Sequence, residues 1–304
     1  MTAFIRRHPA TSYFTLAFLL SWAGVLAVIW PGPIPAPPEE AERRFPFVYL
    51  AMLIGPPVAG IAMTAAVAGR EGLSAYVARL VKWRVGVRGY VLAAATAPMA
   101  LFVTLLALAP WSRDFFPAFL SSTQSAPIQA QSATSFILIA VLVGLGAGLF
   151  EELGWTGFAI PTIRRRLGVE ATGMLVGVCW GAWHFLAILW GSQRAFGSAS
   201  VTLYMTVALF SFLPPYRMLM ARVYESTQSL PVAMLMHASL TTSMIIASPS
   251  ATGNLAIVYD VVFGGALWSI ILILRIQTSN ETARSRLAPP SPRTREHGVR
   301  SGAH

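Results

Sequence analysis

Four ionisable side chains stand inside long apolar stretches of this sequence. Glu151 and Glu152 are adjacent, and His184 and His237 follow in two later apolar runs. A charge near the bilayer centre costs ~2.5–3.5 kcal/mol on insertion scales, so ionisable groups within membrane segments indicate a functional site. A carboxylate beside an imidazole can take a proton from water and make it a nucleophile. A second imidazole and the hydroxyl of Thr241, four residues after His237, can stabilise the oxyanion that forms.

The chemistry that this set predicts is hydrolysis of an amide bond by an activated water molecule. Neither G-x-S-x-G nor H-E-x-x-H occurs in the sequence, so no motif for a serine nucleophile or a paired-histidine zinc site competes. Two histidines and two glutamates could also bind Zn²⁺, and we keep a zinc-dependent protease as the alternative to a cofactor-free one. Two non-enzymatic alternatives remain, a membrane scaffold or immunity protein and a proton-coupled transporter.

The elements that position these residues follow from composition. Of 304 residues, 55% are hydrophobic and only 11% are charged, whereas soluble domains are about one quarter charged. Apolar runs of roughly 20 residues, enough to cross the hydrocarbon layer, recur along the chain. We therefore predict an all-α polytopic membrane bundle of about eight transmembrane helices, in contact with membrane lipids. The predicted spans are residues 11–31, 46–68, 88–110, 132–160, 172–190, 201–221, 230–248 and 255–275.

The net charge of +10 fits membrane topology rather than nucleic-acid binding. If the N-terminus is cytoplasmic, all of the 22 Lys and Arg residues except Arg43, Arg44, Arg113 and Arg194 fall on the cytoplasmic side. The positive-inside rule then places both termini in the cytoplasm. This assignment treats Arg217 as a cytoplasmic topology signal and the first apolar run as an uncleaved helix. A bacterial plasma membrane is the predicted location, and no nucleic-acid partner is expected.

Depth and small residues favour convergence of the four ionisable groups. At a rise of ~1.5 Å per residue, all four would lie roughly 10–18 Å from the cytoplasmic face. Glycines at four-residue spacing precede both Glu152 and His184, and small residues let helices pack closely in lipid. These glycines are Gly144, Gly148, Gly173, Gly177 and Gly181.

Several other features have structural interpretations. Pro56-Pro57 and Pro214-Pro215 are expected to kink the second and sixth spans. The tryptophans near the ionisable groups, at positions 155, 180, 183 and 190, are assigned to packing and interface anchoring. Asp260 is assigned to the outer interface. Residues 1–276 form the predicted transmembrane bundle, and residues 277–304 form a disordered, basic cytoplasmic tail.

Three motifs resemble those of the CPBP intramembrane proteases, the family of CAAX prenyl proteases of type II and bacteriocin-processing enzymes. They are "EELGWTG", "WGAWHF" and "MLMHASLT", within a family-like core of about residues 132–248. The resemblance implies that Glu151 activates water together with His184, that Glu152 supports it, and that His237 and Thr241 form the oxyanion side. It also implies a membrane-associated protein or peptide as substrate.

Three positions depart from the family pattern. Thr156 stands where the family has Arg, Trp180 where it has Phe, and Thr241 where it has Asn. The first change removes a charge partner for the glutamates, and the third replaces an amide by a weaker donor. The resemblance nevertheless favours a glutamate-dependent intramembrane endopeptidase.

Overall fold

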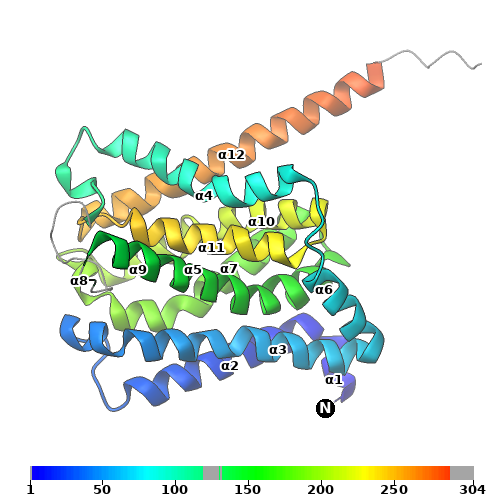
Figure 1. Cartoon of the computed structure of the whole chain (residues 1–304), viewed down its shortest axis with the longest axis horizontal. Helices are drawn as coiled ribbons and strands as arrows, with labels where there is room; N and C mark the ends of the chain where they lie inside the picture. The colour runs from blue at the N-terminus through cyan, green and yellow to red at the C-terminus, as the bar shows by residue number, and fades with distance from the viewer. Residues whose placement is uncertain (1, 119–129, 131, 288–304) are drawn as a thin grey trace, which may run out of the picture. The chain divides into compact units, whose positions relative to one another are not determined.

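The computed structural model describes residues 2–118, 130 and 132–287, and within these ranges the chain is built from helices without β strands (Figure 1). The all-α prediction is confirmed. The longer helices are α2 (Pro9–Ile29), α3 (Pro38–Leu80), α4 (Val87–Leu108), α5 (Ala133–Gly154), α7 (Val169–Gly191), α10 (Leu213–Thr227), α11 (Leu230–Ile246) and α12 (Asn254–Leu287). The shorter ones are α1 (Thr2–Arg7), η1 (Arg113–Phe115), η3 (Trp155–Ala159), α6 (Ile160–Arg164), α8 (Gln193–Phe196) and α9 (Val201–Phe210).

The chain divides into two compact units, Met1–Trp268 and Ser269–His304, and α12 contributes to both. In the second unit the helix continues to Leu287, beyond the boundary at residue 276 that the sequence suggested. No Gly or Pro interrupts residues 266–288, so nothing in that stretch forces the helix to end. Residues 288–304 of the predicted tail lie outside the described residues.

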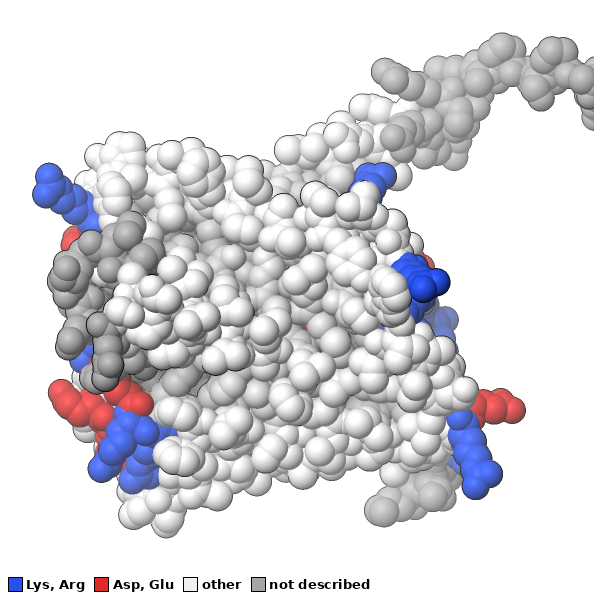
Figure 2. All heavy atoms as spheres, in the orientation of Figure 1, with Lys and Arg blue, Asp and Glu red and all other residues white. Residues whose placement is uncertain are grey.

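Six of the described helices are long and apolar enough to cross a membrane, and α11 is a shorter apolar helix. The six are α2, α3, α4, α5 with its continuation to Arg164, α7, and α12 as far as Asn280. The chain is thus an integral membrane protein. In the space-filling view, the charged side chains of the first unit gather at two ends, and the face between them is almost entirely uncharged (Figure 2).

The predicted sixth span, residues 201–221, is not one continuous helix. It is divided between α9 and α10, with a bend at residues 211–212. Pro214 and Pro215 lie in the first turn of α10, where their missing backbone N–H groups leave no helical bond unmade. The prolines therefore begin a new helix instead of kinking an old one.

Pro56 and Pro57, where the sequence predicts a kink, are part of the same helix as the residues around them. Both prolines lie inside α3, whose backbone leaves the helical region only at Gly69, with φ of 60° and ψ of −148°. This left-handed φ carries little steric cost for glycine because it has no Cβ. After Gly69 the last turns of α3 run to Leu80 and place Tyr76 against the end of α5.

The glycine stripes bring the site-bearing helices into close contact. A Cβ at Gly148 of α5 would lie 2.3 Å from the Met234 carbonyl oxygen of α11. A Cβ at Gly177 of α7 would lie 2.5 Å from the Cα of Pro214 in α10. The predicted close packing at these glycines is confirmed, and it joins α5 to α11 and α7 to α10.

Candidate active site

The two glutamates stand at the last turn of α5, directly before the π-helical turn η3. Such turns are rare in proteins and are frequent at functional sites. Here α3 braces the turn from outside: the Tyr76 hydroxyl donates to the Leu153 carbonyl at 2.7 Å, and Arg79 donates to the Gly157 carbonyl at 2.9 Å. Pro161, which follows in α6, has no backbone N–H to bond the preceding turn. These bonds to the backbone carbonyls hold the acid pair at a defined end of its helix.

Glu152 is completely buried, and both of its oxygens are engaged. Oε1 lies 2.7 Å from Nδ1 of His237 and 2.7 Å from Nη1 of Arg217. Oε2 lies 2.9 Å from the same Arg217 nitrogen and accepts a hydrogen bond from the Thr156 hydroxyl one turn later. A carboxylate bound in this way is suited to holding its neighbours in place.

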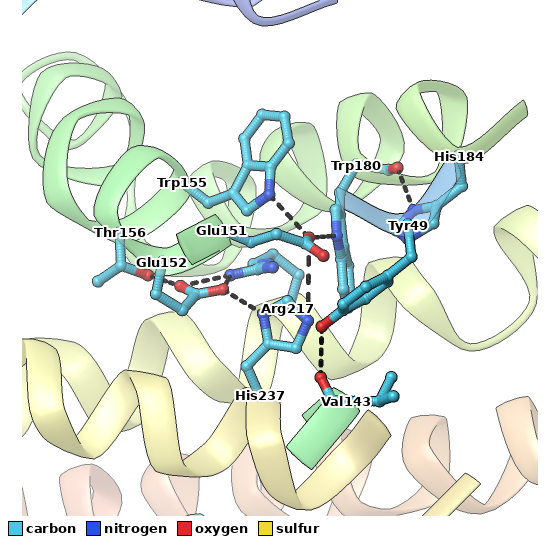
Figure 3. A network of polar contacts seen from close by, with 10 residues as sticks. All are labelled: Tyr49, Val143, Glu151, Glu152, Trp155, Thr156, Trp180, His184, Arg217 and His237. Carbon is cyan, nitrogen blue, oxygen red and sulfur yellow. Dashed lines mark hydrogen bonds and ion pairs between the residues drawn. The ribbon is translucent and has the colours of Figure 1, made fainter. Parts of the chain in front are cut away.

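Glu151, 4% exposed, has a different environment from that of Glu152. Its Oε2 accepts the indole N–H groups of Trp180 at 2.8 Å and Trp155 at 3.2 Å. Oε1 of Glu151 takes part in none of these bonds, and it has no hydrogen-bond partner among the described residues (Figure 3). The less constrained carboxylate therefore has an oxygen free to meet a water molecule.

His237 contacts both acids. Its Nδ1 is hydrogen-bonded to Glu152, and its Nε2 lies 3.9 Å from Oε2 of Glu151. An ionised carboxylate only accepts hydrogen bonds, so Nδ1 of His237 must carry a proton. Nε2 is then the atom that faces Glu151, and it becomes a donor whenever the ring is protonated.

His184 joins the site through Trp180. Its Nδ1 lies 2.9 Å from the Trp180 carbonyl oxygen, and since that oxygen can only accept, Nδ1 of His184 is the donor. The Trp180 ring centroid lies 5.5 Å from that of His184 and 5.0 Å from that of His237. In its neutral form His184 therefore offers Nε2 as a hydrogen-bond acceptor.

Thr241 lies one turn beyond His237 on α11 and is half-buried. Within the part of the chain that the structure describes, its hydroxyl has no hydrogen-bond partner. The structure thus brings Glu151, Glu152 and His237 into contact and adds His184 through the backbone carbonyl and ring of Trp180. Thr241 lies one turn from His237 and has no hydrogen-bond partner among the described residues.

Two kinds of participant were not recognised from the sequence. The tryptophans were assigned to packing, whereas Trp155 and Trp180 donate to Glu151. Arg217 was assigned to the cytoplasmic surface, whereas its side chain is completely buried and ion-paired with Glu152. The i, i+4 spacing of Glu151 and Trp155 was a usable signal for the first. No local signal marked Arg217, because it and Glu152 are 65 positions apart in the sequence.

The donor set does not form a metal site as built. Among the described residues no three His, Cys, Asp or Glu side chains are grouped so that they could hold a metal ion. The two oxygens of Glu152 are bound by Arg217 and Thr156 as well as by His237. We therefore derive no step through zinc.

Two of the similarities to known proteins agree with the resemblance seen in the motifs, and a third is to a different kind of enzyme. Residues 133–243 match the family model described as type II CAAX prenyl endopeptidase Rce1-like. A CAAX prenyl protease 2 of Methanococcus maripaludis is 26% identical over 106 residues, which cover 34% of this chain and 39% of that protein. An alpha-(1->6)-mannopyranosyltransferase of Mycobacterium tuberculosis is 26% identical over 196 residues, 64% of this chain and 32% of that protein. The chain thus spans less than half of the length of either relative.

Proposed function

We propose that this chain, whose residues 133–243 match the Rce1-like family model, is an intramembrane endopeptidase that hydrolyses a peptide bond of a membrane-associated protein or peptide. The observation that carries the proposal is the contrast between the two glutamates. Glu152 is bound on both oxygens, whereas Oε1 of Glu151 has no hydrogen-bond partner among the described residues. The first is suited to support, and the second is suited to activate water.

In the proposed reaction Glu151 takes one proton from water, and the neutral Nε2 of His184 accepts a hydrogen bond from the other. The hydroxide oxygen attacks the carbonyl carbon of the scissile bond, and the negative charge moves to the carbonyl oxygen. Nε2–H of protonated His237 and the Thr241 hydroxyl donate to that oxygen. When the C–N bond breaks, Glu151 returns its proton to the leaving amine.

No cofactor is required by this scheme. The protein would act in a bacterial plasma membrane, on a substrate that reaches the site from the cytoplasmic side. This side of entry follows from the predicted depth of the acid pair.

The test uses purified full-length protein in liposomes and an internally quenched peptide with a lipid anchor. We expect cleavage by the wild type and loss of at least about 1,000-fold in the Glu151→Gln variant, because general acid–base groups contribute ~10²–10⁴-fold. Glu225→Gln, the same change at a glutamate paired with Arg164 outside the site, is the matched control and should retain full activity. Full activity of Glu151→Gln would end the proposal.

Two further arms address the alternatives. Loss of cleavage with a chelator and its recovery with Zn²⁺ would favour the zinc-dependent protease. If Glu151→Gln and His184→Ala both retained full biological function in cells, a non-catalytic scaffold or immunity protein would be favoured instead.

A further inference from the structure

We propose that Arg217 is a positioning residue of this centre: it compensates the charge of Glu152 from a neighbouring helix and so keeps His237 oriented for the reaction. The inference rests on the proposed function, but the pairing itself can be tested without activity. It gives α10 a role in the site, although the sequence marked that helix only as a membrane segment.

The pairing of Arg217 with Glu152 is exclusive among the described residues. Nη1 makes both bonds to the carboxylate, at 2.7 and 2.9 Å, and the Nε and Nη2 atoms have no hydrogen-bond partner there. The side chain is 0% exposed. A buried guanidinium is costly unless an anion compensates it, so Glu152 is the group that accounts for its position.

Arg217 also contacts the other half of the site. Its guanidinium carbon lies 4.2 Å from the centroid of the Trp180 ring, an arrangement in which a cation is attracted by the aromatic face. The same indole donates its N–H to Glu151. One cation therefore lies between the acid that supports His237 and the tryptophan that holds the proposed base (Figure 3).

A charge balance explains what this cation does. When His237 is protonated, the cluster of Glu151, Glu152, Arg217 and His237 carries two negative and two positive charges. Without Arg217 one buried negative charge would be uncompensated, and proteins relieve such a charge by protonating the acid. Glu152 would then cease to be the acceptor that fixes the Nδ1 proton of His237.

Other ionisable side chains near the cluster cannot replace Arg217. Tyr13 from α2, Tyr49 from α3 and His184 from α7 interact electrostatically with the glutamates. All three are uncharged in their ordinary forms at neutral pH, so none supplies a permanent positive charge.

The position one turn after Glu152 offers a direct test. Thr156 already bonds Oε2 of Glu152, the oxygen that Arg217 also contacts, and residues four apart share a helix face. Exchanging the two side chains, in the double variant T156R/R217T, would return a cation to the same carboxylate from η3 and leave the composition unchanged.

The activity measurement compares Arg217→Met, the exchange variant and a control. We expect Arg217→Met to lower kcat by about 100-fold with little change in KM, since a positioned acid–base group contributes ~10²–10⁴-fold. T156R/R217T should recover to within about 10-fold of the wild type, and Arg217→Lys should retain more activity than Arg217→Gln. Arg222 lies on the same helix as Arg217 and pairs with Glu170 of α7, so Arg222→Met is the control and should leave kcat unchanged.

Thermal unfolding of the purified protein tests the pairing independently. Arg217→Met should lower Tm by on the order of 10 °C, because it leaves a buried carboxylate unpaired. The double variant R217M/E152Q should recover at least half of that loss, since the unpaired charge is then removed.

Three results would overturn the inference. They are wild-type kcat in Arg217→Met, an exchange variant that is inactive although its Tm is near that of the wild type, and equal activity of Arg217→Lys and Arg217→Gln. The last comparison decides the matter if Arg217→Met cannot be purified. A wild type that cleaves nothing would instead refute the proposed function, and the Tm measurements would still decide whether Arg217 and Glu152 pair.

Discussion

The contact between α5 and α11 predicts the effect of adding a single methyl group at Gly148. In Gly148→Ala the new Cβ would lie 2.3 Å from the Met234 carbonyl oxygen and 2.9 Å from the Ala238 backbone nitrogen. Ordinary van der Waals contact begins at 3.4 Å, so the two helices must separate by about 1 Å. If α11 moves as a rigid body, the bond of 2.7 Å between His237 and Glu152 lengthens to about 3.7 Å, beyond hydrogen-bonding range.

The expected change in stability is smaller than the expected change in activity. Alanine gains ~1 kcal/mol over glycine in helix propensity, and overpacking costs ~1–3 kcal/mol, so the free energy of unfolding should fall by about 0–2 kcal/mol. That corresponds to a Tm lower by at most about 8 °C. A misplacement of ~1 Å at a catalytic group can cost ~100-fold in rate, and we expect a loss of that order in kcat/KM.

The assay measures peptide cleavage and thermal unfolding for two variants. Gly265→Ala in α12 is the matched control, because a Cβ there meets nothing within 4 Å. Its Tm should not fall, and its activity should be unchanged. If Gly148→Ala kept wild-type kcat/KM and its Tm rose as much as that of Gly265→Ala, the close contact of α5 with α11 and its part in positioning His237 would be refuted.

Two further substitutions test the donors around the reaction space. Trp180→Phe keeps an aromatic ring over Arg217 but removes the indole N–H bonded to Glu151 at 2.8 Å. We expect kcat to fall by about 10-fold or more with KM nearly unchanged. An unaltered kcat would exclude a role for this bond. Thr241→Ala removes the proposed oxyanion donor, so single-turnover cleavage should slow by about 100-fold. The Tm should stay near that of the wild type, because the Thr241 hydroxyl has no hydrogen-bond partner among the described residues. Loss of folding without loss of rate would show instead that Thr241 is structural.

Much of the fold could be predicted from the sequence because lipid imposes simple rules. Apolar length and the near absence of charge predicted the helical membrane bundle, and glycine spacing predicted where α5 and α7 are approached closely. Prolines were less informative. Pro56 stays within α3, whereas Pro214 starts α10, and the choice depends on whether the preceding residues remain helical, which a local pattern does not reveal.

Part of the site could be predicted from the sequence, because placing an ionisable side chain inside a membrane costs free energy. Glu151, Glu152, His184 and His237 stood out because each is ionisable within an apolar run, and their similar depth and the nearby glycines suggested that they meet. The tryptophan donors were harder to recognise, since an indole in a membrane segment is equally suited to packing. Only the geometry shows that Trp155 and Trp180 donate to the proposed base.

Arg217 shows why the positive-inside rule can conceal a functional residue. The rule counts an arginine near a helix end as a surface signal, and by sequence position Arg217 satisfied it. Its actual environment depends on α10 packing against α7 and on a glutamate of α5, which are long-range contacts. Thr156 was a second indication, because it places no cation one turn after the buried acid pair. The compensating positive charge therefore has to come from another part of the chain. In a membrane protein, an unbalanced cluster of buried charges is therefore a reason to search the nominal surface arginines for the missing partner.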